Sequence, residues 1–521
     1  MTYLKKNIKH KLLANSFLFL IFCFSNITQA VVLSSYRTTL VSGTPGQSWG
    51  WGYNSDGQLG DGGKDGRAAA VSLVALDDIK LKQVSTGIDH ALALTETGQV
   101  YSWGKNNDGQ LGNDSIISTQ TPLPLNDLNN IVAVAAGNAY SLAVKNDGTL
   151  WGWGYPGNSN GLPSRNGGYL KPTLINNINN VKTVAASNSG DISDAFSLVL
   201  KQDGSVWGMG VNDKGQLGNG TTVSSKAPTQ VLALKNISAI SVGDCHALAL
   251  KNDGSVYSWG CNDTGKLGNN STSNSTAPIK LSLQNIVAIS SGAYNSMALD
   301  SEGHIWIWGD NSEGQLGDNT KIDQLSPIKV NLDNVVAISS ARAYSVAVLA
   351  DGSVKAWGIN SEGQVGNNKK ATNATESKPV SVLSNSNLQP LNIGSTISSS
   401  ITATYNTNTT RLVIPSLAVS VTPVFGGTPA IQNYSIELQQ RSGGGFVFDL
   451  DINKITQLPS TSSNNCTATY SQSSGRLVIP CLAVSVVSIL GGTPVIQNYS
   501  VELQQRSGGG FVFDLDLASV K

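Results

Sequence analysis

The residues that could do chemistry in this 521-residue chain first gather in a glycine-rich motif. Residues 103–113 read WGKNNDGQLGN, and nearly the same letters return at 308–318 as WGDNSEGQLGD. A phosphate-binding loop cradles its anion with backbone amides and a lysine from a Gly-Lys-Ser/Thr sequence, once per site. This motif recurs along the chain instead, so we interpret its glycines as turn residues of a structural repeat.

Histidines and carboxylates form no recognisable catalytic or metal-binding set. His90 and His246 share one place in the repeat, thirteen residues before the repeat tryptophan, where other copies carry Thr, Tyr, Phe or Asn; we therefore expect packing and hydrogen bonding there. His304 follows a turn glycine, and nucleophile-elbow, HExxH and EF-hand patterns are missing, so we expect neither metal nor cofactor. We interpret acidic pairs such as Asp77-Asp78 as residues of solvated loops. A glycosidase pair assembled from separate repeats stays open, because such carboxylates need not be neighbours in sequence.

The elements that must position these residues come in seven copies. Aligning the chain on its Trp-Gly pairs gives units spaced by 49 to 56 residues, and a glycine stands five residues before each pair. A period near fifty with two glycine turns per unit indicates a repeat array. The tryptophan position is held by Trp51, Trp103, Trp153, Met209, Trp259, Trp308 and Trp357.

Each copy contains the pattern of four short strands. In copy five, apolar residues alternate at 247–250 and 256–259, and the residues 252–254 between them supply a hairpin turn. A further strand is predicted at 237–240, and a fourth near 228–231. Four short strands per fifty residues make one propeller blade, in which the tryptophan fills the wedge between neighbours. The sequence therefore predicts an all-β fold.

The order Gly-x-x-His-x-Leu-Ala-Leu, Asp-Gly, then Trp-Gly-x-Asn-x-x-Gly-Gln-Leu-Gly closely resembles the regulator of chromosome condensation repeat family. The resemblance covers about residues 31 to 385 and implies a seven-bladed β-propeller, which we place at 31–387. This family uses the fold mainly as a protein-binding disc. Its best-known members bind chromatin and act on a small GTPase in the nucleus, but a shared fold does not fix a function.

Residues 1–30 predict a cleaved secretory signal peptide. Four lysines precede an apolar run at 12–24, which is too short and too interrupted to span a membrane, and Thr28-Gln29-Ala30 suits a cleavage site. No later stretch could span a bilayer. Removing the four lysines from 34 basic residues leaves 30 against 34 acidic ones, which makes a poor nucleic-acid binder. We therefore expect a bacterial-type protein that is secreted or held in the periplasm or cell envelope, away from any nuclear role.

A second duplication follows the propeller. RLVIPSLAVSV at 411–421 returns at 476–486 with one change, and the segment 432–451 returns at 497–516, always 65 residues on. Alternating apolar residues and glycine turns predict two small tandem β modules, at 388–456 and 457–521. We attach no function to them.

The cysteines suggest two disulfides. Cys245 and Cys261 lie symmetrically about the turn at 252–253, so they face each other across a hairpin with Cβ atoms about 4.5 to 5.5 Å apart. Whether they form a disulfide stays open, since adjacent antiparallel strands do not always orient two cysteines correctly for one. Cys466 and Cys481 are both present in one copy of the duplication and both absent from the other, which predicts a bonded pair.

Two variable residues precede the His-like position in each copy, in turns that must emerge on one face of the disc. Tyrosine and arginine are enriched in interface hot spots. We therefore predict an exported, monomeric, non-catalytic scaffold that binds a protein or a surface glycan. Alternatives are a secreted carbohydrate-active hydrolase or lyase and, less favoured, guanine-nucleotide exchange on a small GTPase. The predicted binding residues are Tyr36, Arg37, Asp89, Asp244, Tyr294 and Arg342.

Overall fold

The computed structural model describes residues 31–393, apart from 35–36, 44–46, 78, 156–167 and 189–194, and the strands between 401 and 515. Residues 29–396 form one compact unit, and the strands beyond 397 belong to another. The predicted leader and Tyr36 lie outside the described residues. None of the helices in the described part is long and apolar enough to cross a membrane.

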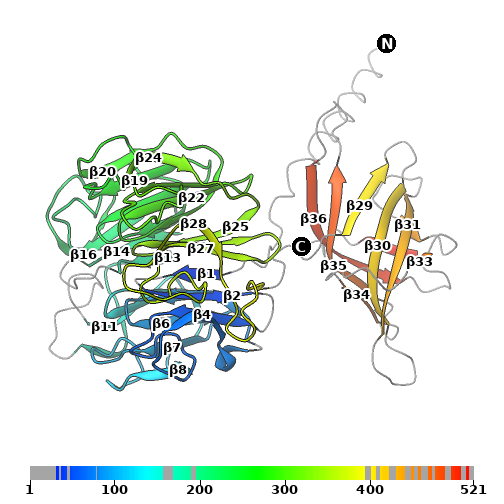
Figure 1. Ribbon diagram of the computed structural model, residues 1–521, viewed down its shortest axis with the longest axis horizontal. Helices are drawn as coiled ribbons and strands as arrows, with labels where there is room; N and C mark the ends of the chain where they lie inside the picture. The colour runs from blue at the N-terminus through cyan, green and yellow to red at the C-terminus, as the bar shows by residue number, and fades with distance from the viewer. Residues whose placement is uncertain are drawn as a thin grey trace, which may run out of the picture. The chain divides into compact units, whose positions relative to one another are not determined.

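The first unit is a ring of seven four-stranded antiparallel sheets, each made of four consecutive strands (Figure 1). The predicted all-β, seven-bladed propeller is therefore confirmed. Blades one to four comprise β1 (Val31–Ser34), β2 (Thr38–Ser42), β3 (Ser48–Gly52), β4 (Arg67–Ser72), β5 (Leu81–Thr86), β6 (His90–Thr95), β7 (Val100–Gly104), β8 (Thr119–Pro124), β9 (Ile131–Ala136), β10 (Tyr140–Lys145), β11 (Leu150–Gly154), β12 (Tyr169–Leu174), β13 (Val181–Ala186), β14 (Phe196–Lys201), β15 (Val206–Gly210) and β16 (Ser225–Gln230). Blades five to seven comprise β17 (Ile237–Val242), β18 (His246–Lys251), β19 (Val256–Gly260), β20 (Ser275–Lys280), β21 (Ile286–Ser291), β22 (Asn295–Asp300), β23 (Ile305–Gly309), β24 (Gln324–Lys329), β25 (Val335–Ser340), β26 (Tyr344–Leu349), β27 (Val354–Ile359) and β28 (Thr375–Ser381).

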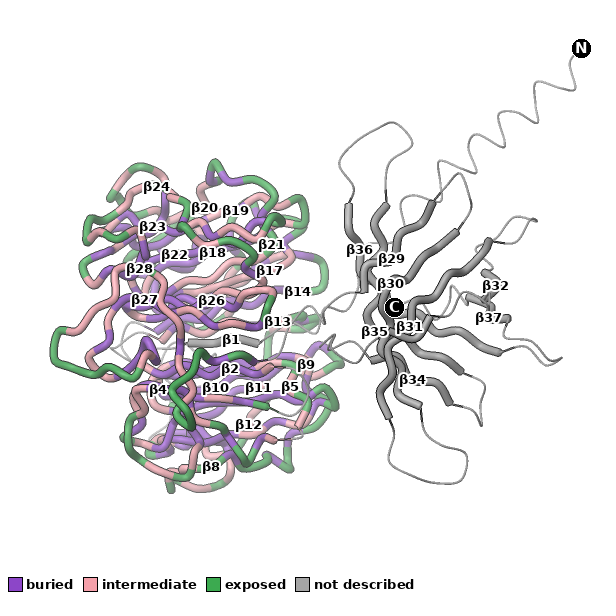
Figure 2. The backbone as a smooth tube through the Cα atoms, turned by 45° about the vertical axis from the view of Figure 1, so that its right-hand side comes forward, coloured by how far each residue is buried: buried purple, intermediate pink, exposed green. Residues whose placement is uncertain are grey.

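Burial falls from the middle strands of each blade to its outer strand (Figure 2). In blade five, β18 and β19 are almost wholly buried, whereas β20 at the rim has no buried residue. The short helix η1 (Val74–Leu76) follows the outer strand of blade one. The hydrophobic core therefore lies between neighbouring blades, where the repeat tryptophans are 0% exposed.

The glycine motif, here called the knot, holds adjacent blades together. Gly112 has φ +71°, and a Cβ there would lie 2.7 Å from Trp153 Nε1 of the next blade, so only glycine fits. Trp153 Nε1 donates to the Gln110 carbonyl oxygen of the preceding knot at 2.8 Å. The same bond joins Trp103 to Gln58 at 2.9 Å and closes the ring from Trp51 to Gln364 at 2.8 Å.

One blade boundary departs from this pattern in both of its partners. Blade four carries Met209 in place of the tryptophan donor, and copy three lacks the Gly-Gln-Leu-Gly sequence that would supply the acceptor. A thioether cannot donate a hydrogen bond, so the acceptor motif has no use at this boundary. The paired loss explains why both irregular copies are neighbours in the chain.

A buried asparagine organises each described Gly-Gln-Leu-Gly knot. In blade two, Asn106 Oδ1 accepts from Leu111 N at 2.9 Å, while its Nδ2 donates to Asn113 Oδ1 at 3.0 Å and to Ser115 O at 2.9 Å. One amide thus fixes a loop of about ten residues, because it satisfies backbone groups that would otherwise be buried unpaired. The equivalent residues are Asn54, Asn212, Asn262, Asn311 and Asn360, each at most 1% exposed.

The ring closes without strand exchange between its ends. β1 supplies the inner strand of blade one, and the segment after β28 bridges blades seven and one. Ala70 N donates to Leu383 O at 2.8 Å, and Ile393 N donates to Gly352 O at 3.0 Å. Leu391 and Ile393 are buried in the core with Trp51. The propeller therefore extends past residue 387.

The second unit is a single nine-stranded sheet shared by both copies of the duplication. The long hairpins repeat each other, with the same register shift between Ile414 and Leu417 and between Ile479 and Leu482. Cys466 lies outside the described residues and the Cys481 side chain is not described, so their predicted disulfide remains a prediction. The strands are β29 (Ile401–Asn406), β30 (Arg411–Val421), β31 (Ala430–Gln440), β32 (Phe448–Leu450), β33 (Thr456–Leu458), β34 (Thr467–Ser471), β35 (Arg476–Val486), β36 (Val495–Gln505) and β37 (Val512–Leu515).

Candidate functional site

One face of the propeller, here called the knot face, carries the turns between first and second strands together with the knots between third and fourth strands. Antiparallel order places both at the same end of every blade. The two are joined by backbone hydrogen bonds, such as Lys105 N to Asp89 O at 2.8 Å and Cys261 N to Cys245 O at 2.9 Å. The opposite, hairpin face carries the glycine hairpins and the links between blades.

Each knot begins with a residue that faces the turn, and the chemistry of this pair varies around the ring. In blade one, the Arg37 guanidinium lies 5.4 Å from the centre of the Tyr53 ring. In blade two, Lys105 Nζ lies 3.3 Å from Asp89 Oδ2. In blade five, the pair is the disulfide Cys245–Cys261, with Cα atoms 5.5 Å apart. A constant backbone therefore presents variable side chains at one face.

The structure brings together only some of the predicted binding residues. Arg37, Asp89, Asp244, Tyr294 and Arg342 are all half-buried in the turns of the knot face. The Arg342 guanidinium lies 5.9 Å from the centre of the Tyr294 ring, and Lys266 Nζ lies 5.6 Å from it. Arg37 and Asp89 belong to other blades around the ring. Tyr294 is thus the centre of a cationic and aromatic cluster built from blades five, six and seven.

Asp89 shows how burial tunes a charge on this face. Burial raises the pKa of its carboxyl group above the ordinary value, the Lys105 ammonium opposes that shift, and the nearby Asp56 charge adds to it. The carboxylate side chain is 23% exposed. Asp89 is therefore a structural ion-pair partner as well as a surface group.

A cavity of about 240 Å³ lies among the inner strands. Its volume is below the roughly 300–1,000 Å³ of small-molecule pockets. Three lining hydroxyls are used between blades: Ser85 Oγ, Ser241 Oγ and Ser290 Oγ each accept from a backbone N–H of the next blade at 2.9 Å. Among the described lining residues Asp244 is the single carboxylate, whereas a glycosidase centre needs two.

The histidines bond across blade boundaries rather than within one repeat. His90 Nε2 lies 2.9 Å from Ser141 Oγ, and Ser141 Oγ donates to Gln110 O at 2.8 Å. Because the serine proton is used, His90 Nε2–H must be the donor to Ser141 Oγ. Burial lowers the pKa of His90 to about 3. For His246, burial and then the Lys266 charge lower the pKa well below its ordinary value.

The hydroxyl residue that bonds the His90-like position from the next blade was not predicted, although the sequence contains a signal for it. Tyr140 Oη bonds Ser197 Oγ at 2.8 Å, and Tyr344 Oη bonds Thr39 Oγ1 at 3.0 Å, as the histidines bond their serines. Phe196, which cannot form this bond, is followed one blade later by Ala247 in place of the hydroxyl. Comparing consecutive copies would therefore have located the contact.

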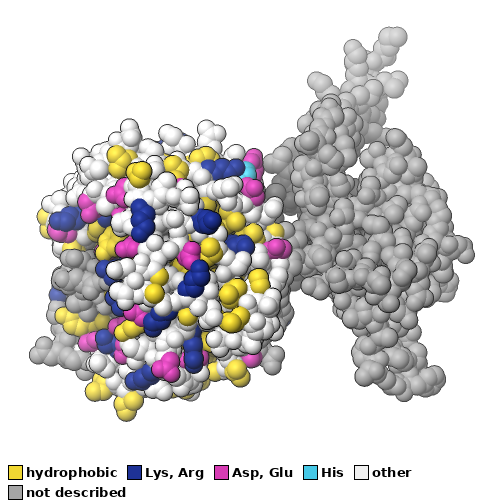
Figure 3. Space-filling model, viewed as in Figure 1, with side chains coloured by type: hydrophobic (Ala, Val, Ile, Leu, Met, Phe, Trp, Pro, Cys, Tyr) yellow, Lys and Arg dark blue, Asp and Glu magenta, His cyan; other side chains and the backbone are white. Residues whose placement is uncertain are grey.

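No group of three or more His, Cys, Asp or Glu side chains among the described residues is placed to hold a metal ion. His304 is on the hairpin face, where its Nδ1 lies 3.2 Å from Asp300 Oδ2. Basic and acidic side chains are interspersed over the side of the propeller in view (Figure 3). That side lacks the basic stripe on which nucleic-acid binders rely.

Family models match most of the propeller sequence. The model of the RCC1-like domain matches residues 191–409. Two models of the regulator of chromosome condensation (RCC1) repeat match residues 45–94 and 97–144, and residues 81–110 and 131–161.

Curated relatives are similar over shorter stretches. RCC1 domain-containing protein RUG3, mitochondrial, of Arabidopsis thaliana is 38% identical over 96 residues, which are 18% of this chain and 22% of that protein. The probable E3 ubiquitin-protein ligase HERC6 of Homo sapiens is 37% identical over 190 residues, 36% of this chain and 18% of that protein. The chain thus spans less than a quarter of the length of either relative.

Solved structures show the same fold. Prp20p from Saccharomyces cerevisiae, described with its binding properties to Gsp1p and histones, is 21% identical with a TM-score of 0.58 over 69% of this chain and 89% of that one. Human WBSCR16 is 22% identical with a TM-score of 0.55 over 65% of this chain and 94% of that one. At these identities the likeness concerns the architecture alone.

Proposed function

Because this chain belongs to the regulator of chromosome condensation repeat family, we propose that it is a non-catalytic scaffold that docks another protein on its knot face after export from the cell. The cluster of Tyr294, Lys266 and Arg342 carries the proposal. An aromatic ring flanked by two cations, at 5.6 and 5.9 Å, is the combination found in interface hot spots.

The scaffold beneath this face suits a docking role. Knots, tryptophans and buried asparagines fix the backbone of each blade, while the turn side chains differ from one blade to the next. Variable residues on a rigid frame bind with little loss of backbone entropy. A protein is the favoured partner over a surface glycan, since arginine and half-buried tyrosine pair well with carboxylates and apolar side chains.

Export is proposed on two features. Residues 1–30 carry the pattern of a secretory leader, and a disulfide such as Cys245–Cys261 persists in oxidising compartments. The mildly acidic mature chain disfavours nucleic acid as partner. We propose a secreted or envelope-associated monomer.

Affinity capture from the culture medium and envelope of the producing organism tests the docking role. Tyr294→Ala and Arg342→Ala are expected to weaken binding of the captured protein by about 1 to 2 kcal/mol or more each, with the melting temperature unchanged. Val74→Ala on the hairpin face, at a residue 75% exposed, is the control and keeps full affinity. Undiminished binding by both knot-face variants would place the interface elsewhere.

A further inference from the structure

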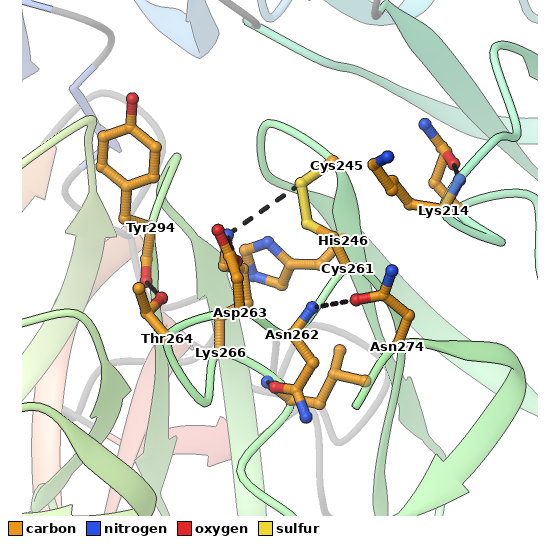
Figure 4. Close-up of a disulfide and its surroundings, with 12 residues drawn as sticks. Lys214, Cys245, His246, Cys261, Asn262, Asp263, Thr264, Lys266, Asn274 and Tyr294 are labelled. Atoms are coloured by element: carbon orange, nitrogen blue, oxygen red, sulfur yellow. Dashed lines mark hydrogen bonds and ion pairs between the residues drawn. A yellow bond between two sulfur atoms is a disulfide. The ribbon is translucent and has the colours of Figure 1, made fainter. Parts of the chain in front are cut away.

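Lys266 stands where the other Gly-Gln-Leu-Gly knots carry glutamine. In those knots the glutamine side chain accepts a backbone hydrogen bond from two residues earlier, as Gln315 Oε1 does from Glu313 N at 2.9 Å. An ammonium group cannot accept that bond. The Lys266 side chain is instead only 2% exposed, and its Nζ lies 2.6 Å from Asp263 Oδ1 and 4.0 Å from Cys245 Sγ (Figure 4).

The lysine coincides with the cysteines. Copy five is the single repeat with cysteine at the turn position, the single repeat with cysteine at the start of the knot, and the single repeat with lysine in place of the glutamine of Gly-Gln-Leu-Gly. Cys261 is 4% exposed, whereas Cys245 is half-buried at the knot face. Three substitutions that meet at one sulfur atom form one chemical unit rather than three separate changes.

The charge of Lys266 is only partly compensated. A buried ammonium group is costly unless anions and hydrogen bonds surround it, and the Asp263 carboxylate beside it is 73% exposed to water. The Lys266 charge acts on the neighbouring Asp263. Burial alone would raise the pKa of Asp263, but the hydrogen bond and charge of Lys266 help to hold that pKa below its ordinary value. A second anion next to Nζ would therefore be stabilised, and Cys245 Sγ, 4.0 Å from Nζ, is an atom able to become one.

We propose that Cys245 is a thiol–disulfide exchange site: an external dithiol opens the Cys245–Cys261 bond, and Lys266 then holds Cys245 as a thiolate on the knot face. This inference does not depend on the docking partner.

The exchange proceeds in two steps. A thiolate of the external dithiol attacks the sulfur of the half-buried Cys245, the bond to Cys261 breaks, and the Cys261 sulfur leaves with the electron pair and takes up a proton. The second thiolate of the reductant then attacks the reductant's first sulfur, which is bonded to Cys245 in the mixed disulfide. Cys245 leaves as a thiolate beside Lys266. The protein gains two electrons and the dithiol becomes a disulfide. Lys266 favours the second step because a better stabilised thiolate leaves faster.

The test measures alkylation of Cys245 in the full chain. Protein reduced with dithiothreitol is pulsed with iodoacetamide at pH 7, and peptide mass spectrometry separates Cys245 from every other cysteine. An opposite charge at this distance shifts a titration by one unit or more, and part of the gain in thiolate is offset because a less basic thiolate is a weaker nucleophile. Lys266→Gln should therefore slow alkylation of Cys245 about threefold or more. Gln is the residue of the sister knots, and Lys235→Gln, which removes an exposed lysine from the hairpin face, should leave the rate unchanged.

Two more variants keep the test decisive if Lys266→Gln unfolds. Lys266→Arg retains the charge and should retain the fast rate, and Asp263→Asn removes the competing anion and should raise it. In a glutathione redox buffer, Lys266→Gln should also shift the reduced-to-oxidised ratio of the pair toward the disulfide, because the Cys245 thiolate loses its counter-charge. Equal alkylation rates in the parent protein, Lys266→Gln and Asp263→Asn would overturn the proposal, whereas loss of partner capture alone would not bear on it.

Discussion

Acidification should destabilise the propeller through its two buried histidines. The pKa of His90 falls from 6.5 to about 3 on folding because burial disfavours the charged ring. Since the unfolded chain binds the proton more tightly, stability is fully present above pH 6.5 and is lost as pH falls from 6.5 towards 3. Each pH unit below 6.5 removes about 1.4 kcal/mol of stability. At pH 4.5 the buried His90 alone therefore lowers the free energy of unfolding by about 2.7 kcal/mol. His246 shifts in the same direction and adds to the loss.

Urea unfolding followed by tryptophan fluorescence measures this effect, because all ten tryptophans lie in the propeller. The matched variant is His90→Tyr, since Tyr140 fills the same position in the next blade and bonds Ser197 as His90 bonds Ser141. Between pH 7.5 and 4.5, His90→Tyr should lose about 2.7 kcal/mol less than the parent protein, a difference in which the carboxylates common to both cancel. An identical loss in both proteins would refute the buried neutral histidine.

Three further substitutions test the contacts between and within blades by the same urea unfolding. Trp103→Phe should cost about 1 kcal/mol more than Trp153→Phe, because Gln58 O has only the indole as its side-chain donor, whereas the acceptor of Trp153 keeps the Ser141 hydroxyl; equal costs would contradict the role of the indole N–H. Asn311→Ala should cost about 3 kcal/mol or more, since it strips several buried hydrogen bonds from one knot, and a cost below 1 kcal/mol would mean that the knot holds its shape without the amide.

The repeat period made the propeller predictable from sequence. Seven tryptophan positions and paired glycine turns determine blade number and strand order, because four short strands can bury their apolar faces only against equivalent neighbours. Leu391 and Ile393, just beyond the predicted module boundary at 387, contribute to the core between blades seven and one. Their apolar letters alone do not reveal which blade they cover.

The candidate site was less accessible to sequence reasoning. The turn positions were identified from the repeat, but the contact between Tyr294 and Arg342 depends on how adjacent blades approach. The sequence shows Lys266 as a departure from Gly-Gln-Leu-Gly, but its burial beside Cys245 follows only from the fold of the loop. Contacts within one repeat can thus be predicted from spacing, whereas contacts between repeats require the ring.

Hydrogen exchange of the protein bound to its captured partner tests the docking face most directly. We predict slower exchange on binding at the knot-face turns 292–294 and 341–343, with the hairpin-face turns 252–254 and 301–303 unchanged. Protection confined to the hairpin face, or to residues beyond 397, would contradict the account.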